Sequence, residues 1–228
     1  MARTILIVSA TDAEAGIVES IEGLKPHNNC FRFHGLDISV LVTGVGTVMT
    51  AWKMQQWLSQ NRLPSLAINI GIAGSFRDDL KTGDVVIPEA DCFADMGVET
   101  DSGFITLFEA GLCDPEKEPF KNGWIHSDPL ILSRIPKRYR QVRAITVNTV
   151  SGSAETISKY VIKYNPDIET MEGAAFFYIC SVMRIPFFSL RSISNRITPG
   201  RREKWDISSA LASLSYSLHE LLLIPEMP

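Results

Sequence analysis

Short, continuous apolar runs recur along the chain, and they constrain its fold more than any other feature. They span residues 4–10, 38–44, 66–71, 84–88, 143–150 and 186–194. Because each run is apolar nearly throughout rather than alternating, it is typical of a strand buried on both faces. Helical patterns lie between some of these runs, at 48–60, 171–183 and 207–223. Strands that alternate with helices predict an α/β layer sandwich.

The rest of the sequence gives no sign of a second domain. No repeat, low-complexity stretch or linker interrupts the 228 residues, so we expect one domain over residues 1–228. Residues 91–130 are rich in turn-forming and acidic residues, and we expect them to form a long excursion from the sheet.

Charge and residue spacing argue against several classes of partner. The net charge is −4 and the basic residues are scattered, which speaks against nucleic acid. The four cysteines are far apart and show no zinc-like spacing, so we expect no metal. The apolar stretch 173–183 is interrupted by Arg184 and Pro186, short of the roughly 20 residues of a membrane span. We therefore expect a cytoplasmic protein with free thiols and no membrane partner.

Small and polar residues follow most of the predicted strands. The segments are "SATDAE" (9–14), "TGVGT" (43–47), "GIAGS" (71–75), "SGSAET" (151–156) and "RSISN" (191–195). Open α/β sheets bind ligands at the carboxyl ends of their strands, and glycines there let backbone amides approach the ligand. Neither glycine segment has the spacing of a dinucleotide or triphosphate site, so the sequence predicts no such cofactor.

Each of these residues also has an ordinary structural explanation. Glu14 would then be an exposed residue in the first turn of a helix, Arg191 half of a salt bridge, and Asn195 a turn cap. The glycine segments would be plain turns. The joint position of these residues at strand ends is what favours a functional site.

The segment "IETMEGAAFFYIC" (168–180) carries a further signal. We expect Glu169 and Glu172 to open a helix whose remainder is uncharged. A carboxylate that enters so apolar a segment is costly to bury without hydrogen-bond partners. Glu172 is either an exposed first-turn acid or a carboxylate whose two oxygens each accept a hydroxyl of a cis-diol.

Taken in order, "ATDAE", "TGVG", "NIGIAG", "SGSA", "ETMEGAA" and "RSISN" resemble the purine nucleoside phosphorylase/methylthioadenosine nucleosidase superfamily. The resemblance runs from residue 4 to about 223, nearly the whole chain. It implies a three-layer sandwich with a central mixed β-sheet flanked by helices, and a homodimer or larger homo-oligomer. It also implies cleavage of the N-glycosidic bond of a small-molecule nucleoside at the carboxyl ends of the strands.

The resemblance assigns roles to individual residues. Glu172 would hold the ribose 2′- and 3′-hydroxyls with Met171 packed beside the sugar, and Glu14 would orient or activate the attacking water. Arg191 and Ser194 fall where the family places polar groups, with Arg191 counted among the catalytic residues and Ser194 orienting the side chain of residue 195. Ala73 and Gly74, in the glycine-rich segment after the third strand, would let the backbone approach the substrate.

Asn195 departs from the adenine-cleaving nucleosidases, which have an aspartic acid at this place. A protonated aspartic acid can donate to purine N7 and release its proton to the leaving base. A 6-oxopurine presents two acceptors, N7 and O6, to which an amide N–H can donate. Asn195 therefore predicts a 6-oxopurine base, although an adenine site with another way of stabilising the leaving group stays open.

The positions of the arginines favour water over phosphate as the nucleophile. The family's phosphorylases bring arginines to the loops after the first and third strands. This chain has an acid in the loop after the first strand, and only Arg77 lies near the loop after the third. Arg191 alone is too little for a phosphate site. An amide at 195 followed by "RITPGRREKWDI" (196–207) is similar to a branch of the superfamily that removes hypoxanthine from a nucleoside with a benzoate-bearing 5′ extension, on a route to menaquinone.

Further residues are assigned to the 5′ extension and to the base of the substrate. Trp205 would stack on the 5′ extension, and Arg201 or Arg202 would pair with its carboxylate unless they are ordinary exposed arginines. Glu155, with the adjacent Thr156, would face the base, where an acid can accept the N1–H of a 6-oxopurine. Glu155 is equally well explained as a first-turn acid of a helix.

Two other functions remain open from the sequence. One is a methylthioadenosine/S-adenosylhomocysteine nucleosidase or an inosine phosphorylase, within the same superfamily. The other is a nucleoside-binding protein without turnover, against which the presence of Glu14 argues because binding alone would not need it. Trp52 and Trp57 in the predicted helix 48–60 would lie either at a subunit contact or in the core.

Overall fold

A computed structural model describes residues 3–101, 103–201 and 205–224, apart from the side chain of Arg201. The strands are β1 (Arg3–Ser9), β2 (Lys25–His27), β3 (Cys30–Phe33), β4 (Leu36–Val42), β5 (Leu66–Ser75), β6 (Val85–Asp91), β7 (Gly97–Thr100), β8 (Gly103–Thr106), β9 (Ile125–His126), β10 (Arg140–Thr146), β11 (Ile168–Thr170) and β12 (Phe187–Arg196). The helices are α1 (Asp12–Glu19), α2 (Thr47–Gln60), α3 (Pro129–Arg134), α4 (Ala154–Tyr164), α5 (Gly173–Val182), the 3₁₀ turn η1 (Pro199–Arg201) and α6 (Ile207–Leu222).

One large mixed sheet forms the centre of the protein. Its order is β11-β10-β6-β12-β5-β1-β4-β3-β2, and β9 pairs with β6. Strands β4, β1, β5 and β12 are parallel to one another, whereas β6 pairs with β12 in the antiparallel sense and β10 and β11 follow the direction of β6. The predicted central mixed sheet is confirmed.

The sheet also closes on itself at one end. Strand β11 pairs with β10 on one side and with the far half of β5 on the other, where Glu169 lies opposite Gly74. The sheet thus contains a closed ring of paired strands, made of β5, β12, β6, β10 and β11. This closure brings the ends of β10 and β11 to the ends of β5 and β12, although the two sets run in opposite directions.

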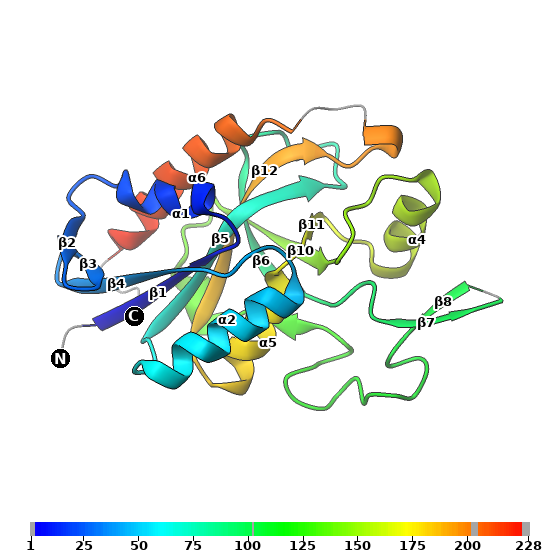
Figure 1. Cartoon of the computed structure of the whole chain (residues 1–228). Helices are drawn as coiled ribbons and strands as arrows, with labels where there is room; N and C mark the ends of the chain where they lie inside the picture. The colour runs from blue at the N-terminus through cyan, green and yellow to red at the C-terminus, as the bar shows by residue number, and fades with distance from the viewer. Residues whose placement is uncertain (1–2, 102, 202–204, 225–228) are drawn as a thin grey trace.

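Helices cover both faces of the sheet (Figure 1). On one face, α1 and α6 pack Ile17, Val18, Leu214 and Leu218 onto the buried strand residues of the larger core. On the other face, α2 and α5 contribute apolar side chains such as Met54 and Phe176 to a second core. The burial of these apolar faces stabilises the layered arrangement, with roughly 25 cal/mol for each Å² of apolar surface removed from water.

Most long elements lie close to their predicted positions, and the short ones differ. Glu169 belongs to strand β11 and not to the following helix, so the expectation that it helps to open that helix is wrong. The reason is tertiary, because a three-residue strand gains its hydrogen bonds from two neighbouring strands that lie far away in the sequence. The excursion at 91–130 is confirmed and contains the β7–β8 hairpin, which projects from the body in Figure 1.

None of the described helices is long and apolar enough to cross a bilayer.

Candidate active site

A cavity of about 320 Å³ opens where the strand ends meet. Its wall comes from the β1–α1 junction, the loop before α2, the end of β5, the β11–α5 junction, the end of β12 and the start of α6. Eight predicted site residues line it: Glu14, Ala73, Gly74, Met171, Glu172, Ser194, Asn195 and Trp205. The structure therefore brings together residues that are as much as 191 positions apart in the chain, as Glu14 and Trp205 show.

Glu14 lies in the first turn of α1 and is only 6% exposed, so it is not the solvated first-turn acid that the ordinary explanation required. Thr11 and Glu14 form a capping box at the helix start. The Oε2 atom of Glu14 accepts from Ala10 N, Thr11 N and Thr11 Oγ1 at 3.2, 3.0 and 2.9 Å. Its Oε1 accepts from Ile72 N at 3.1 Å and retains acceptor capacity toward the cavity.

Glu172 is also 6% exposed, and it occupies the N-cap position of α5. Its Oε1 atom does not cap that helix but accepts from Gly46 N at 2.9 Å, across the cavity mouth. Burial raises the pKa of Glu172, and the nearby charge of Glu14 adds to this, while Arg191 and the Gly46 N–H oppose the shift. The carboxylate is thus buried at the cavity wall and anchored by one oxygen.

Ser194 and Asn195 stand at the end of β12, where the strand has a bulge opposite β5. Ser194 Oγ donates to Asn195 Oδ1 at 2.8 Å, which fixes the amide with its nitrogen as the free donor. Asn195 Nδ2 donates to Arg196 O at 3.2 Å, so one of its two N–H bonds is left for a ligand. The side chain is 8% exposed and lines the cavity.

Arg191 is fully buried beneath the cavity and is not part of its wall. Its Nε donates to Ser189 Oγ at 3.1 Å and its Nη2 donates to Asn69 Oδ1. Gly71 makes room for this arrangement, since a Cβ there would overlap Arg191 Nη1 and lie 2.8 Å from Glu14 Oε1. The guanidinium therefore approaches Glu14 from below and acts on the site through its charge.

Several buried polar residues around the site were not predicted from the sequence. Asn69 sits inside an otherwise apolar strand, which was a visible signal for a buried partner of Arg191. Glu169 lines the cavity and accepts from Ser151 N at 2.9 Å and from Ser151 Oγ. Asp91 and Thr146 form a buried hydrogen bond of 2.9 Å at the ends of β6 and β10. No local pattern marked these two, because their meeting depends on the register of the sheet.

Besides Arg191, two predicted residues, Glu155 and Thr156, are not in the cavity wall. Glu155 is exposed in the first turn of α4, in agreement with its ordinary structural explanation, and Thr156 N donates to Oγ of Ser153, the N-cap residue of that helix. Trp205 lines the cavity and is 42% exposed. Arg202 and the side chain of Arg201 lie outside the described residues.

The remainder of the wall is largely apolar. Val45, Val150, Ile197, Ile207 and Leu211 contribute to it, and no arginine, lysine or histidine does so among the described residues. The described part of the chain also holds no group of three or more side chains suited to a metal ion. The polar groups of the site are thus carboxylates, one amide, backbone donors and the hydroxyls of Thr11, Thr170 and Ser194.

The closed mixed sheet and the acid-lined cavity at its strand ends define the nucleoside-cleaving class that the sequence resembles. The Phosphorylase superfamily profile matches residues 4–219, and the chain belongs to this superfamily.

Individual relatives agree with the family assignment. The chain is 30% identical over 227 residues to a futalosine hydrolase of Acidothermus cellulolyticus, covering 95% of this chain and 89% of the relative. It is 26% identical over 211 residues to a 5′-methylthioadenosine/S-adenosylhomocysteine nucleosidase of Buchnera aphidicola, covering 90% and 86%. The native structure of futalosine hydrolase of Helicobacter pylori shares the fold, with a TM-score of 0.74, 18% identity and coverage of 97% and 96%.

Proposed function

We propose that this chain hydrolyses the N-glycosidic bond of futalosine and releases hypoxanthine. The observation that carries the proposal is the oriented amide of Asn195. Because the Ser194 hydroxyl donates to the amide oxygen, the amide nitrogen keeps an N–H for a base, and a 6-oxopurine presents the acceptors N7 and O6 at that edge. The similarity to a futalosine hydrolase at 30% identity supports the same choice.

In the proposed reaction, Glu14 orients the attacking water and accepts its proton. The water oxygen bonds to C1′ as the C1′–N9 bond breaks, and the electron pair leaves with the purine. Asn195 donates to the negative charge that develops on the base but supplies no proton, which the base takes from water. Glu172 holds the ribose hydroxyls through the oxygen that Gly46 does not occupy.

The charges of the site support water rather than phosphate as the nucleophile. Phosphate sites use arginines or backbone donors that face the anion. Among the described residues that line the cavity, the ionisable ones are Glu14, Glu169 and Glu172, and ionised carboxylates would repel phosphate. Arg191 is occupied by Asn69 and Ser189 below the wall.

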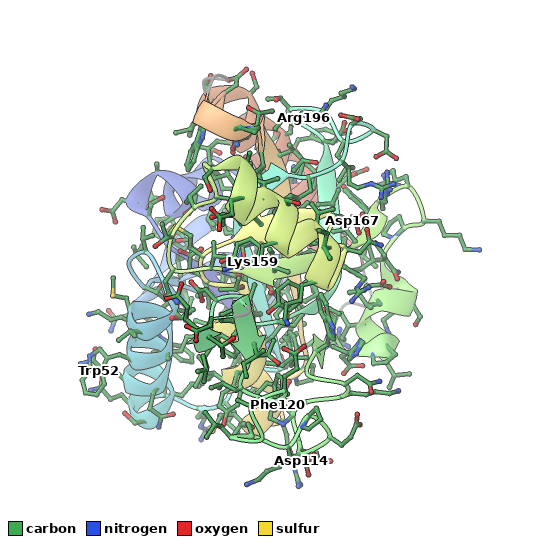
Figure 2. The ribbon with its side chains drawn as sticks, turned by 90° about the vertical axis from the view of Figure 1, so that its right-hand side faces the viewer. Trp52, Asp114, Phe120, Lys159, Asp167 and Arg196 are labelled. Atoms are coloured by element: carbon green, nitrogen blue, oxygen red, sulfur yellow. The ribbon has the colours of Figure 1, made fainter. Side chains whose placement is uncertain are left out.

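An aromatic 5′ extension suits the apolar side of the cavity. Trp205 is half-exposed at its edge, where an indole can stack on a planar group, and Ile207 and Leu211 follow it on α6. We further propose that residues 1–228 act as one domain, that the enzyme works in the cytoplasm on a route to menaquinone, and that it forms a homo-oligomer. Exposed apolar residues on α2 support the oligomer, among them Trp52, which points outward in Figure 2.

The test is base release from futalosine, inosine and 5′-methylthioadenosine, each with and without phosphate. We expect hypoxanthine release from futalosine to be fastest and to be independent of phosphate. Adenine release from methylthioadenosine as the best reaction would instead identify the methylthioadenosine nucleosidase that the relative of Buchnera aphidicola suggests. A strict need for phosphate would identify a phosphorylase, and binding without release of any base would identify a binding protein.

The variant Asn195→Asp directly tests whether the amide of Asn195 sets the base preference. We expect kcat/KM for futalosine to fall about tenfold or more, because an ionised carboxylate facing O6 replaces a hydrogen-bond donor. The ratio of adenine to hypoxanthine release should rise. An unchanged base preference would remove Asn195 from specificity.

A further inference from the structure

The start of helix α5 is capped in an unusual way. The first N–H groups of a helix need acceptors, and the N-cap side chain normally supplies one. Here the N-cap residue is Glu172, whose carboxylate makes no capping bond to the described helix and instead binds Gly46 N. The helix therefore depends on acceptors from elsewhere.

Two threonines from neighbouring strands supply them. Thr170 Oγ1 accepts from Gly173 N at 3.3 Å, and Thr146 Oγ1 accepts from Ala174 N at 2.8 Å. The two hydroxyls are 3.2 Å apart, and both threonines are buried. Because Thr146 ends β10 and Thr170 ends β11, the sheet itself fixes where the helix and its N-cap Glu172 begin.

Asp91 sets the direction of the Thr146 hydroxyl. A hydroxyl has one proton, and that of Thr146 goes to Asp91 Oδ1 at 2.9 Å, which turns its lone pairs toward Ala174 N. The Asp91 side chain is completely buried, and its Oδ2 has no hydrogen-bond partner among the described residues. Gly173 leaves room for this oxygen, since a Cβ there would overlap it.

A neutral side chain would serve a purely structural cap at lower cost. An aspartate buried with one oxygen unpartnered is expensive, and Arg191 is the cation whose charge offsets this cost. Glu172 and Cys92 are the other titratable groups whose charges interact with Asp91. The same arginine also favours the ionised form of Glu172, so Asp91, Arg191 and Glu172 form one buried electrostatic unit under the cavity.

We propose that Asp91, acting through Thr146, is a positioning residue that holds Glu172 in place for the sugar hydroxyls. The inference rests on the proposed function in one respect, namely that Glu172 binds a ribose. It does not depend on which base the enzyme releases. It assigns a role in sugar recognition to two residues that do not touch the cavity.

The experiment measures the ratio of kcat/KM for a ribonucleoside to kcat/KM for its 2′-deoxy counterpart. The pair is built on whichever of futalosine, inosine and methylthioadenosine the wild type hydrolyses best, so a wrong base assignment leaves the test intact. We expect Asp91→Asn and Thr146→Val each to lower this ratio about tenfold, the factor that corresponds to loss of a hydrogen bond to a charged group. Thr146→Ser, which keeps the hydroxyl, should restore most of the ratio.

Ser127→Ala is the matched control. Ser127 is a buried residue whose hydroxyl donates to Pro88 O on the same strand as Asp91. Its loss should lower the melting temperature without changing the ratio. If Asp91→Asn and Thr146→Val lower only the melting temperature and keep the wild-type ratio, their role is structural and the proposal is overturned. Should Thr146→Val not fold, the nearly isosteric Asp91→Asn decides alone.

Discussion

The starts of helices α1 and α5 each present a buried glutamate to the cavity, but they hold it in different ways. At α1, Glu14 is part of a capping box, and three of its four hydrogen bonds come from Ala10 and Thr11, within four residues. At α5, Glu172 bonds to Gly46, which is 126 residues away, and the helix is capped by Thr170 and Thr146.

This difference shows two solutions to the burial of an acid. A carboxylate that accepts several N–H and O–H bonds, as Glu14 does, is fixed in direction. Glu172 has fewer partners, and its pKa is raised because burial outweighs the help from Arg191 and Gly46. We infer that the first arrangement suits a group that must be aimed at water, whereas the second keeps acceptor capacity for a ligand.

The largest effect should come from Glu14→Gln, which keeps the shape of the α1 capping box and removes the negative charge. We expect kcat to fall by about 10²- to 10⁴-fold, the usual contribution of a positioned acid–base group, with little change in the affinity for hypoxanthine. Single-turnover base release measures this change. Glu19→Gln, at an exposed position of the same helix, is the control, and a wild-type rate in Glu14→Gln would remove Glu14 from the mechanism.

Glu172→Gln should have a smaller effect and a different one. The amide retains one acceptor oxygen but loses the charge, so we expect kcat/KM for the ribonucleoside to fall roughly 10- to 100-fold, which corresponds to 1.5–3 kcal/mol. The 2′-deoxynucleoside should lose much less. If both substrates lose activity equally, Glu172 acts on the reaction in general and the contrast with Glu14 disappears.

Thr11→Val should weaken the local cap of α1 without abolishing activity. The hydroxyl both donates to Glu14 Oε2 and accepts from Glu14 N, and loss of such an N-cap costs about 0.5–2 kcal/mol. The backbone donors of Ala10, Thr11 and Ile72 remain, so the rate should fall far less than in Glu14→Gln. Urea denaturation and kcat measure the two effects, with Thr11→Ser expected to behave like the wild type. A loss of rate as large as that of Glu14→Gln would show that the backbone bonds do not hold the carboxylate.

The last prediction concerns the pH dependence of stability in Asp91→Asn. Burial raises the pKa of Asp91 from an ordinary value of 3.8 to about 7, against the opposing effects of Thr146 and Arg191. Between these values the folded protein keeps a proton that the unfolded chain releases, so this contribution is complete below about pH 4 and is lost as the pH rises through about 7. The stability of the wild type should therefore decline between about pH 4 and 7 more steeply than that of Asp91→Asn. Equal slopes in urea denaturation would contradict the assigned protonation.

The local sequence was sufficient to predict the layers of the fold and most of the cavity wall. Long buried strands such as β1 and β12 can be predicted from the sequence because a run that is apolar on both faces is stable only inside a sheet. Glu14, Glu172, Ser194 and Asn195 could be predicted because strand ends in this fold class converge. The position of Glu155 on the surface, and not in the cavity wall, depended on where α4 begins.

By itself, the sequence determined which segments form the main strands and helices, and it determined the capping box of α1, because both depend on neighbours within a few residues. Only the tertiary structure decided that the three-residue strand β11 closes the sheet against β5, and that Thr146, Asp91 and Arg191 support Glu172 from other strands. These contacts are set by sheet register and burial over long sequence separations. A hydrogen bond between residues so far apart forms only when the whole sheet fixes both partners at once.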